Sequence, residues 1–244
     1  MYQFGEKHPV IFEIILTILS FLAAAVFVAA GSILNVHPDF CSSVGRIIVG
    51  AALMLLYRRA FTGIETKKNY LILLPALLFA AWNLFYNLSL GLEIGGSVYF
   101  MEAALTAFAP ALFEEVLFRG IFLYNLQKTG RSDLACMLIS SILFAVLHLT
   151  NIAGMDALSV AIQFGYSLVI GMVLAAVYLK NNSILQVIAL HFLIDFTPRI
   201  FVEQAVSATT MHIVLFVILL AAEAAYAVKL CLPGKQTADA AQQS

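Results

Sequence analysis

Two adjacent carboxylates and an arginine interrupt an otherwise apolar stretch of the chain. Glu114 and Glu115 are followed by Arg119, four residues after the second acid. Because an α-helix turns about 100° per residue, Arg119 lies on the face of Glu115 and cannot easily serve Glu114 as well. A charged side chain near the centre of a bilayer costs about 2.5–3.5 kcal/mol, so an intramembrane acid pair points to a functional site. We therefore expect Glu115 and Arg119 to support the structure and Glu114 to remain available for chemistry.

Further polar side chains interrupt two later apolar stretches. His148 ends the run Phe144-Ala-Val-Leu-His148, and His191 and Asp195 lie four residues apart on one helix face. With a rise of 1.5 Å per residue, Glu114 and His148 would lie about 20 Å deep, Asp195 about 18 Å and His191 about 12 Å. The sequence therefore predicts one pocket near the middle of the membrane in which these acids and imidazoles meet.

Glutamate and histidine together are groups that can activate water. The carboxylate takes a proton from water, while an imidazole positions the water or carries the proton to the leaving amine. Glu114, His148 and His191 are also suitable ligands for a zinc ion with an open water position. The residue types leave both mechanisms open, with either no cofactor or a divalent metal such as zinc.

The composition places these residues in a polytopic membrane protein. The 244 residues are 62% hydrophobic and 11% charged, whereas soluble domains are about 45–50% apolar and 25% charged. We expect an all-α fold, a membrane helix bundle forming one transmembrane domain over residues 1–232, with a disordered polar tail over 233–244. About eight transmembrane helices are predicted from apolar runs near residues 10–31, 44–57, 70–90, 98–127, 134–150, 157–179, 184–200 and 211–231.

Local signals refine this expectation. Pro110 predicts a kink one turn before Glu114. The first apolar run is too long for a signal peptide, so we expect it to remain as an anchor.

Lys and Arg residues favour a cytoplasmic location for both termini. The residues then assigned to the cytoplasmic side are Lys7, Arg58, Arg59, Lys67, Lys68, Lys128, Arg131, Lys180, Lys229 and Lys235, while Arg46 and Arg199 fall near the other side.

Charge and cysteine content exclude other classes of protein. A net charge of −1 without a basic tract argues against nucleic acid as a partner. Cys41, Cys136 and Cys231 are too few and too scattered for a disulfide framework or a Cys-x-x-Cys metal site. The partners that remain are the lipid bilayer and a membrane-associated peptide or protein.

Three short motifs occur in order on the predicted membrane helices. Glu114 to Arg119 matches E-E-x-x-x-R, Phe144 to His148 matches F-x-x-x-H, and His191 to Asp195 matches H-x-x-x-N/D. Over about residues 98–200 the chain resembles the CAAX prenyl endopeptidase and bacteriocin-processing family of intramembrane proteases, also called the Abi family. The resemblance implies hydrolysis of peptide bonds within or at the membrane.

The resemblance also implies roles for individual residues. Those matching Glu114 and His148 would activate water, and those matching His191 and Asp195 would stabilise the oxyanion, while Glu115 and Arg119 would be the paired support of the site. Many members have Asn at the position of Asp195, and an ionised Asp cannot donate a hydrogen bond to an oxyanion. Asp195 must therefore be protonated, bind a metal or orient His191.

The predicted function is an intramembrane endopeptidase that cleaves membrane-associated, lipidated or leader peptides, in what we expect to be a bacterial plasma membrane. One alternative is a proton- or ion-coupled transporter, because buried acids and histidines also build proton relays. Such transporters typically contain inverted repeats, and no internal repeat stands out here. Another alternative is a non-catalytic scaffold or immunity protein with the same fold.

Overall fold

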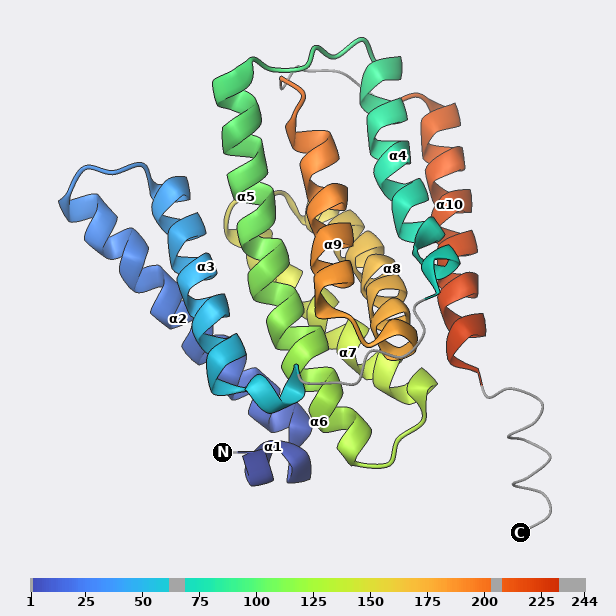
Figure 1. Cartoon of the computed structure of the whole chain (residues 1–244). Coiled ribbons are helices and arrows are strands. Elements are labelled where there is room, and N and C mark those ends of the chain that lie inside the picture. The colour runs from blue at the N-terminus through green and yellow to red at the C-terminus, as the bar shows by residue number, and fades with distance from the viewer. Residues whose placement is uncertain (1, 62–68, 203–207, 233–244) are drawn as a thin grey trace.

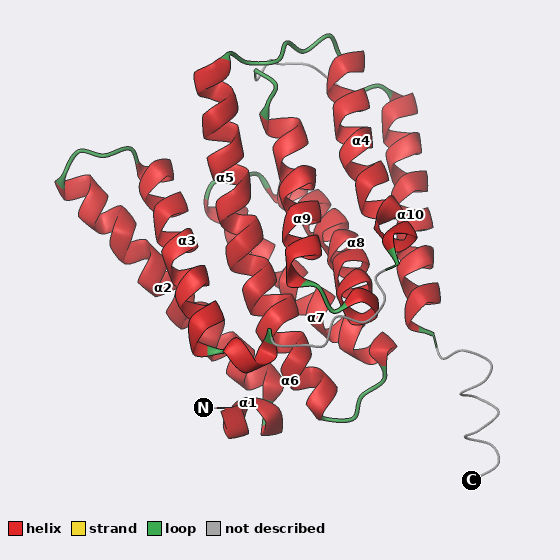
Figure 2. Ribbon diagram, viewed as in Figure 1, coloured by secondary structure: helices red, strands yellow, loops and turns green. Residues whose placement is uncertain are grey.

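The chain folds into a bundle of long helices (Figures 1 and 2). The computed structural model describes residues 2–61, 69–202 and 208–232, so the predicted tail over 233–244 lies outside the described residues. The α-helices are α1 (Tyr2–Lys7), α2 (Pro9–Ile33), α3 (Pro38–Leu56), α4 (Leu74–Ser89), α5 (Ser97–Glu115), α6 (Leu123–Lys128), α7 (Asp133–Leu147), α8 (Ala157–Asn181), α9 (Ile184–Arg199) and α10 (Thr210–Cys231). Short 3₁₀ segments cover Arg58–Ala60, Tyr70–Leu73 and His148–Ala153.

Each predicted apolar run coincides with one of these helices or with consecutive helical segments. Among the described residues, six helices are long and apolar enough to cross a membrane: Pro9–Ile33, Pro38–Leu56, Tyr70–Ser89, Asp133–Ala153, Ala157–Asn181 and Thr210–Cys231. The remaining two predicted runs correspond to α5 with its continuation and to α9. The predicted all-α polytopic bundle is confirmed, and the protein is an integral membrane protein.

Helices α5 and α9 lie side by side in the middle of the bundle (Figure 1). Asn83 of α4 donates a hydrogen bond from Nδ2 to the carbonyl of Ile194 in α9, at 3.0 Å. The α2–α3 hairpin packs on α5 at its lower end and leans away from it towards the top of the figure. Helix α3 thus packs against α5 and α4 against α9, on either side of the central pair.

The segments that precede α5 and follow α9 are joined by backbone hydrogen bonds. Ile94 and Phe201 form an isolated antiparallel bridge. Next to it, the N–H of Gly95 donates to the carbonyl of Ile200 and the N–H of Val202 donates to the carbonyl of Glu93, each at 2.9 Å. These bonds hold the start of α5 beside the end of α9.

The basic residues assigned to the cytoplasmic side lie, where they are described, on elements at one end of the bundle. In Figure 1, α1, the α6–α7 turn and the end of α10 are all found there. At that end Lys180 Nζ lies 2.8 Å from Asp133 Oδ2, which joins α8 to α7. Lys67, Lys68 and Lys235 lie outside the described residues. The clustering agrees with an even number of crossings, while the side of the membrane stays a prediction.

The fourth predicted span departs from regular α geometry beyond the two carboxylates. Helix α5 continues through Pro110 to Glu115, and the next seven residues, Val116–Phe122, form a π-helix before α6 begins. All seven are buried. A π segment inside a longer helix is uncommon and frequently occurs at a functional site. Here it contains Arg119.

Candidate active site

Glu115 connects two of the central elements through one carboxylate oxygen. Its Oε1 accepts a hydrogen bond from Arg119 Nη1 at 2.7 Å and another from His191 Nδ1 at 2.8 Å. The Glu115 side chain is 0% exposed. The Glu115–Arg119 ion pair predicted from the four-residue spacing is therefore present, but the bond from Glu115 to His191 was not predicted. Sequence spacing could not show it because the two residues are on different helices.

The arginine has two further supports. Arg119 Nη2 donates to the carbonyl of Gly171 in α8 at 3.1 Å. The Phe144 ring of α7 covers the guanidinium carbon, with 4.5 Å from Cζ to the ring centroid, a distance at which a desolvated cation is attracted to the ring face. Arg119 therefore brings the π segment, α7 and α8 together behind the two acids.

Glu114 has none of these partners. It is 9% exposed, lines a pocket, and forms no hydrogen bond or ion pair with any residue that the structure describes. The helix turn that separates neighbouring residues directs Glu114 away from the guanidinium of Arg119. Two adjacent glutamates thus have different surroundings, one held by a cation and an imidazole and the other free to meet a ligand.

His148 is held in one orientation by the backbone of the preceding helical turn. Its Nδ1 lies 3.0 Å from the carbonyl oxygen of Phe144, and its ring packs edge-on against the Phe144 ring at 4.9 Å. A carbonyl oxygen only accepts, so Nδ1 carries the proton and a neutral ring presents an unprotonated Nε2. His148 lines the same pocket as Glu114. Its free nitrogen is therefore available as a proton acceptor.

Asp195 has a partner that sequence reasoning missed. Its Oδ2 accepts a hydrogen bond from Arg199 Nη2 at 3.1 Å, while its Oδ1 is 3.9 Å from His191 Nε2, too long for a hydrogen bond. The Asp195–Arg199 spacing repeats that of Glu115 and Arg119, so the sequence contained the signal. In this ion pair Asp195 Oδ2 acts as a hydrogen-bond acceptor.

The predicted residues line one pocket of about 960 Å³. Glu114 of α5, His148 at the end of α7, and His191 and Asp195 of α9 all contribute to its wall. Glu102 also lines it, as do several polar residues of α3 and α8 that the sequence did not suggest. The expectation that three separate helices bring these acids and imidazoles to one hollow agrees with the structure.

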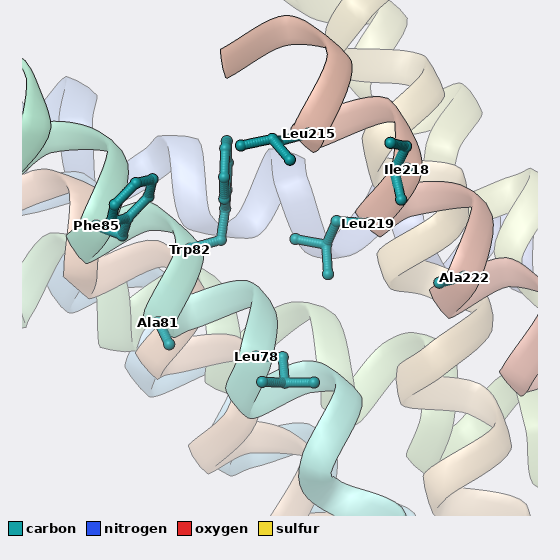
Figure 3. A pocket seen from close by; sticks show the side chains of 8 residues that line it. All are labelled: Leu78, Ala81, Trp82, Phe85, Leu215, Ile218, Leu219 and Ala222. Carbon is teal, nitrogen blue, oxygen red and sulfur yellow. The ribbon is translucent and has the colours of Figure 1, made fainter. Parts of the chain in front are cut away.

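A second hollow contains no group that could perform chemistry. It lies between α4 and α10, has a volume of about 470 Å³, and is lined by Leu78, Ala81, Trp82, Phe85, Leu215, Ile218, Leu219 and Ala222 (Figure 3). Trp82 stacks on Phe216, which in turn lines the pocket of Glu114. The stacked rings of Trp82 and Phe216 therefore lie between this apolar hollow and the polar pocket.

A protein metal site needs several His, Cys, Asp or Glu side chains around one point. Among the described residues, no three His, Cys, Asp or Glu side chains form a group that could hold one ion. As arranged, Glu114, His148 and His191 do not fit a zinc site. The three cysteines are buried and free.

Comparison with known proteins gives one match. Residues 95–197 match the family model described as type II CAAX prenyl endopeptidase Rce1-like. The matched segment includes Glu114, His148, His191 and Asp195. No curated protein and no solved structure matches the chain.

Proposed function

Because the chain belongs to the CAAX prenyl endopeptidase family through residues 95–197, we propose that it is an intramembrane endopeptidase in which Glu114 and His148 activate water against a peptide bond. The substrate we propose is a membrane-associated peptide, lipidated or a leader peptide. The observation that supports this most is the contrast between a neutralised Glu115 and an unpaired Glu114 in one pocket with His148 and His191. A purely structural acid pair would need a partner for each carboxylate.

Glu114 is proposed as the general base. It takes a proton from a water molecule, and the oxygen of that water adds to the carbonyl carbon of the peptide bond. Nε2 of His148 accepts a hydrogen bond from the same water and keeps it aligned with the carbonyl. In the second step the proton passes to the leaving amine as the carbon–nitrogen bond breaks. No step requires a metal ligand.

His191 is proposed to stabilise the negative oxygen of the tetrahedral intermediate. When both of its nitrogens carry a proton, Nδ1 donates to Glu115 and the Nε2–H is a donor beside the Asp195 carboxylate. A donor placed where charge develops contributes more in a pocket shielded from water than in solution. Asp195, ion-paired with Arg199, is then a positioning residue that favours the proton on Nε2.

The decisive experiment compares two carboxylates of the same pocket. Purified protein in nanodiscs is incubated with a library of lipidated peptides, and products are identified by mass spectrometry. Glu114→Gln should lower kcat by at least about 100-fold, in line with the loss of a general base. The matched control is Glu102→Gln, which removes an exposed carboxylate that lines the pocket on α5 and should leave kcat within about twofold.

The same assay is run with a chelator and again after addition of Zn²⁺, and we expect equal rates. Unchanged cleavage by Glu114→Gln would refute the assignment of the base. Loss of activity with the chelator and recovery with Zn²⁺ would replace the side-chain mechanism with a metal-dependent one.

A further inference from the structure

Helix α9 contains a proline in its last turn, and this proline leaves one backbone carbonyl without its usual partner. In a regular α-helix the carbonyl of Ile194 would accept a hydrogen bond from the N–H of residue 198. That residue is Pro198, which lies inside α9 and has no N–H. Ile194 is only 5% exposed, and a buried carbonyl without a donor costs free energy. This turn of α9 therefore needs a donor from outside its own backbone.

The donor is supplied by α4. Asn83 Nδ2 donates a hydrogen bond to the carbonyl oxygen of Ile194 at 3.0 Å. Among the described residues, the Thr197 hydroxyl also reaches this carbonyl, at 3.4 Å, which is long for a hydrogen bond. A carbonyl only accepts, so the amide nitrogen of Asn83 is the atom that faces it. Asn83 thus takes, from a separate helix, the place of the missing proline N–H.

This bond is made within the turn of α9 that carries the site residues. Ile194 follows His191 by three residues and directly precedes Asp195. His191 Nδ1 is bound to Glu115 of α5 at 2.8 Å. The turn is therefore held by two neighbouring helices, through a side chain to α5 and through the backbone to α4. Together these contacts restrict its rotation and height, and with them the direction of His191 Nε2.

A second asparagine of α4 gives a direct comparison. Asn87 is one turn beyond Asn83, and its Nδ2 donates to the backbone carbonyl of Asn83 at 2.7 Å, within the same helix. Asn83 also lines the pocket that contains Glu114 and His191. The two residues share a type and a helix, but the bond of Asn83 connects α4 to the site and the bond of Asn87 stays within α4.

We propose that Asn83 is a positioning residue, which binds the carbonyl that Pro198 leaves open and so directs His191 towards the reacting carbonyl group. This assignment rests on the proposed endopeptidase function. A misplacement of about 1 Å at a catalytic group can lower a rate by about 100-fold, so one interhelical hydrogen bond is sufficient for such a role. The family match begins at residue 95, so the site depends on a helix that precedes the matched segment.

The test is a double-mutant cycle between Asn83 and Pro198. Asn83→Leu removes the donor, and Pro198→Ala restores an N–H that can bind the Ile194 carbonyl within α9. With proline present, Asn83→Leu should lower kcat by roughly 10- to 100-fold and change KM by less than about threefold. In the Pro198→Ala background the same substitution should lower kcat by less than about threefold. Asn87→Leu is the matched control and should keep kcat within about twofold.

A second measurement does not depend on turnover. NMR of isotope-labelled histidines in nanodiscs reports the surroundings of each imidazole, and the signals of His191 are identified by their loss in His191→Gln. We expect these signals to shift in Asn83→Leu, to return towards wild-type values in the double variant, and to stay unchanged in Asn87→Leu. This pattern supports the positioning role even if wild-type protein cleaves no peptide.

Other results would overturn the assignment while leaving the protease intact. One is an Asn83→Leu variant whose kcat and His191 signals match wild type, even if its thermal stability falls, because Asn83 would then only join two helices. Another is an equal loss of kcat with and without the proline, since Asn83 would then not act through the Ile194 carbonyl. If Pro198→Ala alone abolishes turnover, the His191 signals of the four proteins decide in the same way.

Discussion

The two central helices differ from the six described helices that qualify as membrane spans. Helix α9 has only sixteen residues, and α5 contains three carboxylates, at Glu102, Glu114 and Glu115. The qualifying helices contribute their apolar side chains to the outside of the bundle, where residues such as Leu22, Leu55 and Ile218 are exposed. The two helices that do not qualify as spans thus hold Glu114 and His191, whereas His148 lies in the qualifying span Asp133–Ala153.

Charged side chains in the two regions are handled differently. In the centre, Glu115 is bound by Arg119 and His191. In the surrounding spans, Glu13 of α2 is buried with Thr17 as its hydrogen-bond partner, and Glu223 of α10 is buried with an unpartnered Oε1. Each of these side chains is almost fully buried. The centre contains ion pairs, whereas these two outer acids form none with a described residue.

The largest expected effect is loss of the central carboxylate. Glu115→Ala leaves Arg119 buried without its counter-ion and releases His191, so we expect destabilisation of about 3–5 kcal/mol, the usual result of breaking one side of a buried ion pair. Unfolding in detergent, followed by circular dichroism, measures it.

The matched change in the outer region is Glu223→Gln, which removes an acid that has no ion pair in the described structure and should change stability by less than about 1 kcal/mol. Similar losses in the two variants would contradict a difference between centre and periphery.

A smaller effect is expected from the contact between α7 and α8 behind the site. A Cβ at Gly171 would lie 3.2 Å from Ser141 Cβ and 3.3 Å from the Phe144 ring, whereas one at Gly165 of the same helix would meet nothing within 4 Å. Gly171→Ala should therefore cost about 1–3 kcal/mol through overpacking and lower activity by moving Phe144.

Gly165→Ala is the control for this helix. It should be neutral or stabilising by up to about 1 kcal/mol, since alanine favours the helix. Thermal unfolding of the two variants gives the comparison, and an equal response would show that the α7–α8 contact does not need glycine.

The smallest effect concerns the exposed start of α8. Asp156 accepts backbone hydrogen bonds from Leu158 and Ser159, and the Ser159 hydroxyl with these N–H groups lowers the pKa of the Asp156 carboxyl. A carboxyl whose pKa is lower in the folded state than in the unfolded state stabilises the protein at pH values above its unfolded-state pKa. This stabilisation is lost as the pH falls through the folded-state pKa. Asp156→Ala should slightly lower Tm at neutral pH, and the difference should shrink at acidic pH. A difference independent of pH would contradict the role of the charge.

Sequence patterns predicted what depends on one helix at a time. The apolar runs gave the spans, and four-residue spacing gave the Glu115–Arg119 pair. The bond between Glu115 and His191 depends on the register of α5 against α9, which periodicity does not specify. The π segment was also missed. Its surroundings are tertiary contacts, such as the Phe61 ring with which a Cβ at Gly120 would collide, and the sequence does not show these contacts.

Two side chains show how tertiary context changes the meaning of a residue. His212 is in the first turn of α10, yet it is buried, and its Nε2 lies 2.9 Å from Ser89 Oγ of α4. From the sequence, Arg46 was predicted only to be a positive charge near one face of the membrane. In the structure it lines the pocket of Glu114 from a distant part of the chain, which no local pattern could reveal.

The bridge between Ile94 and Phe201 closes the segment that contains the three motifs into a ring. The family match runs from residue 95 to residue 197, so both of its ends lie next to this backbone clasp. Within this segment α5 packs on α9, and the Phe144 ring of α7 lies 5.9 Å from the His191 ring of α9. The backbone clasp therefore ties together the two ends of the segment that holds Glu114, His148 and His191.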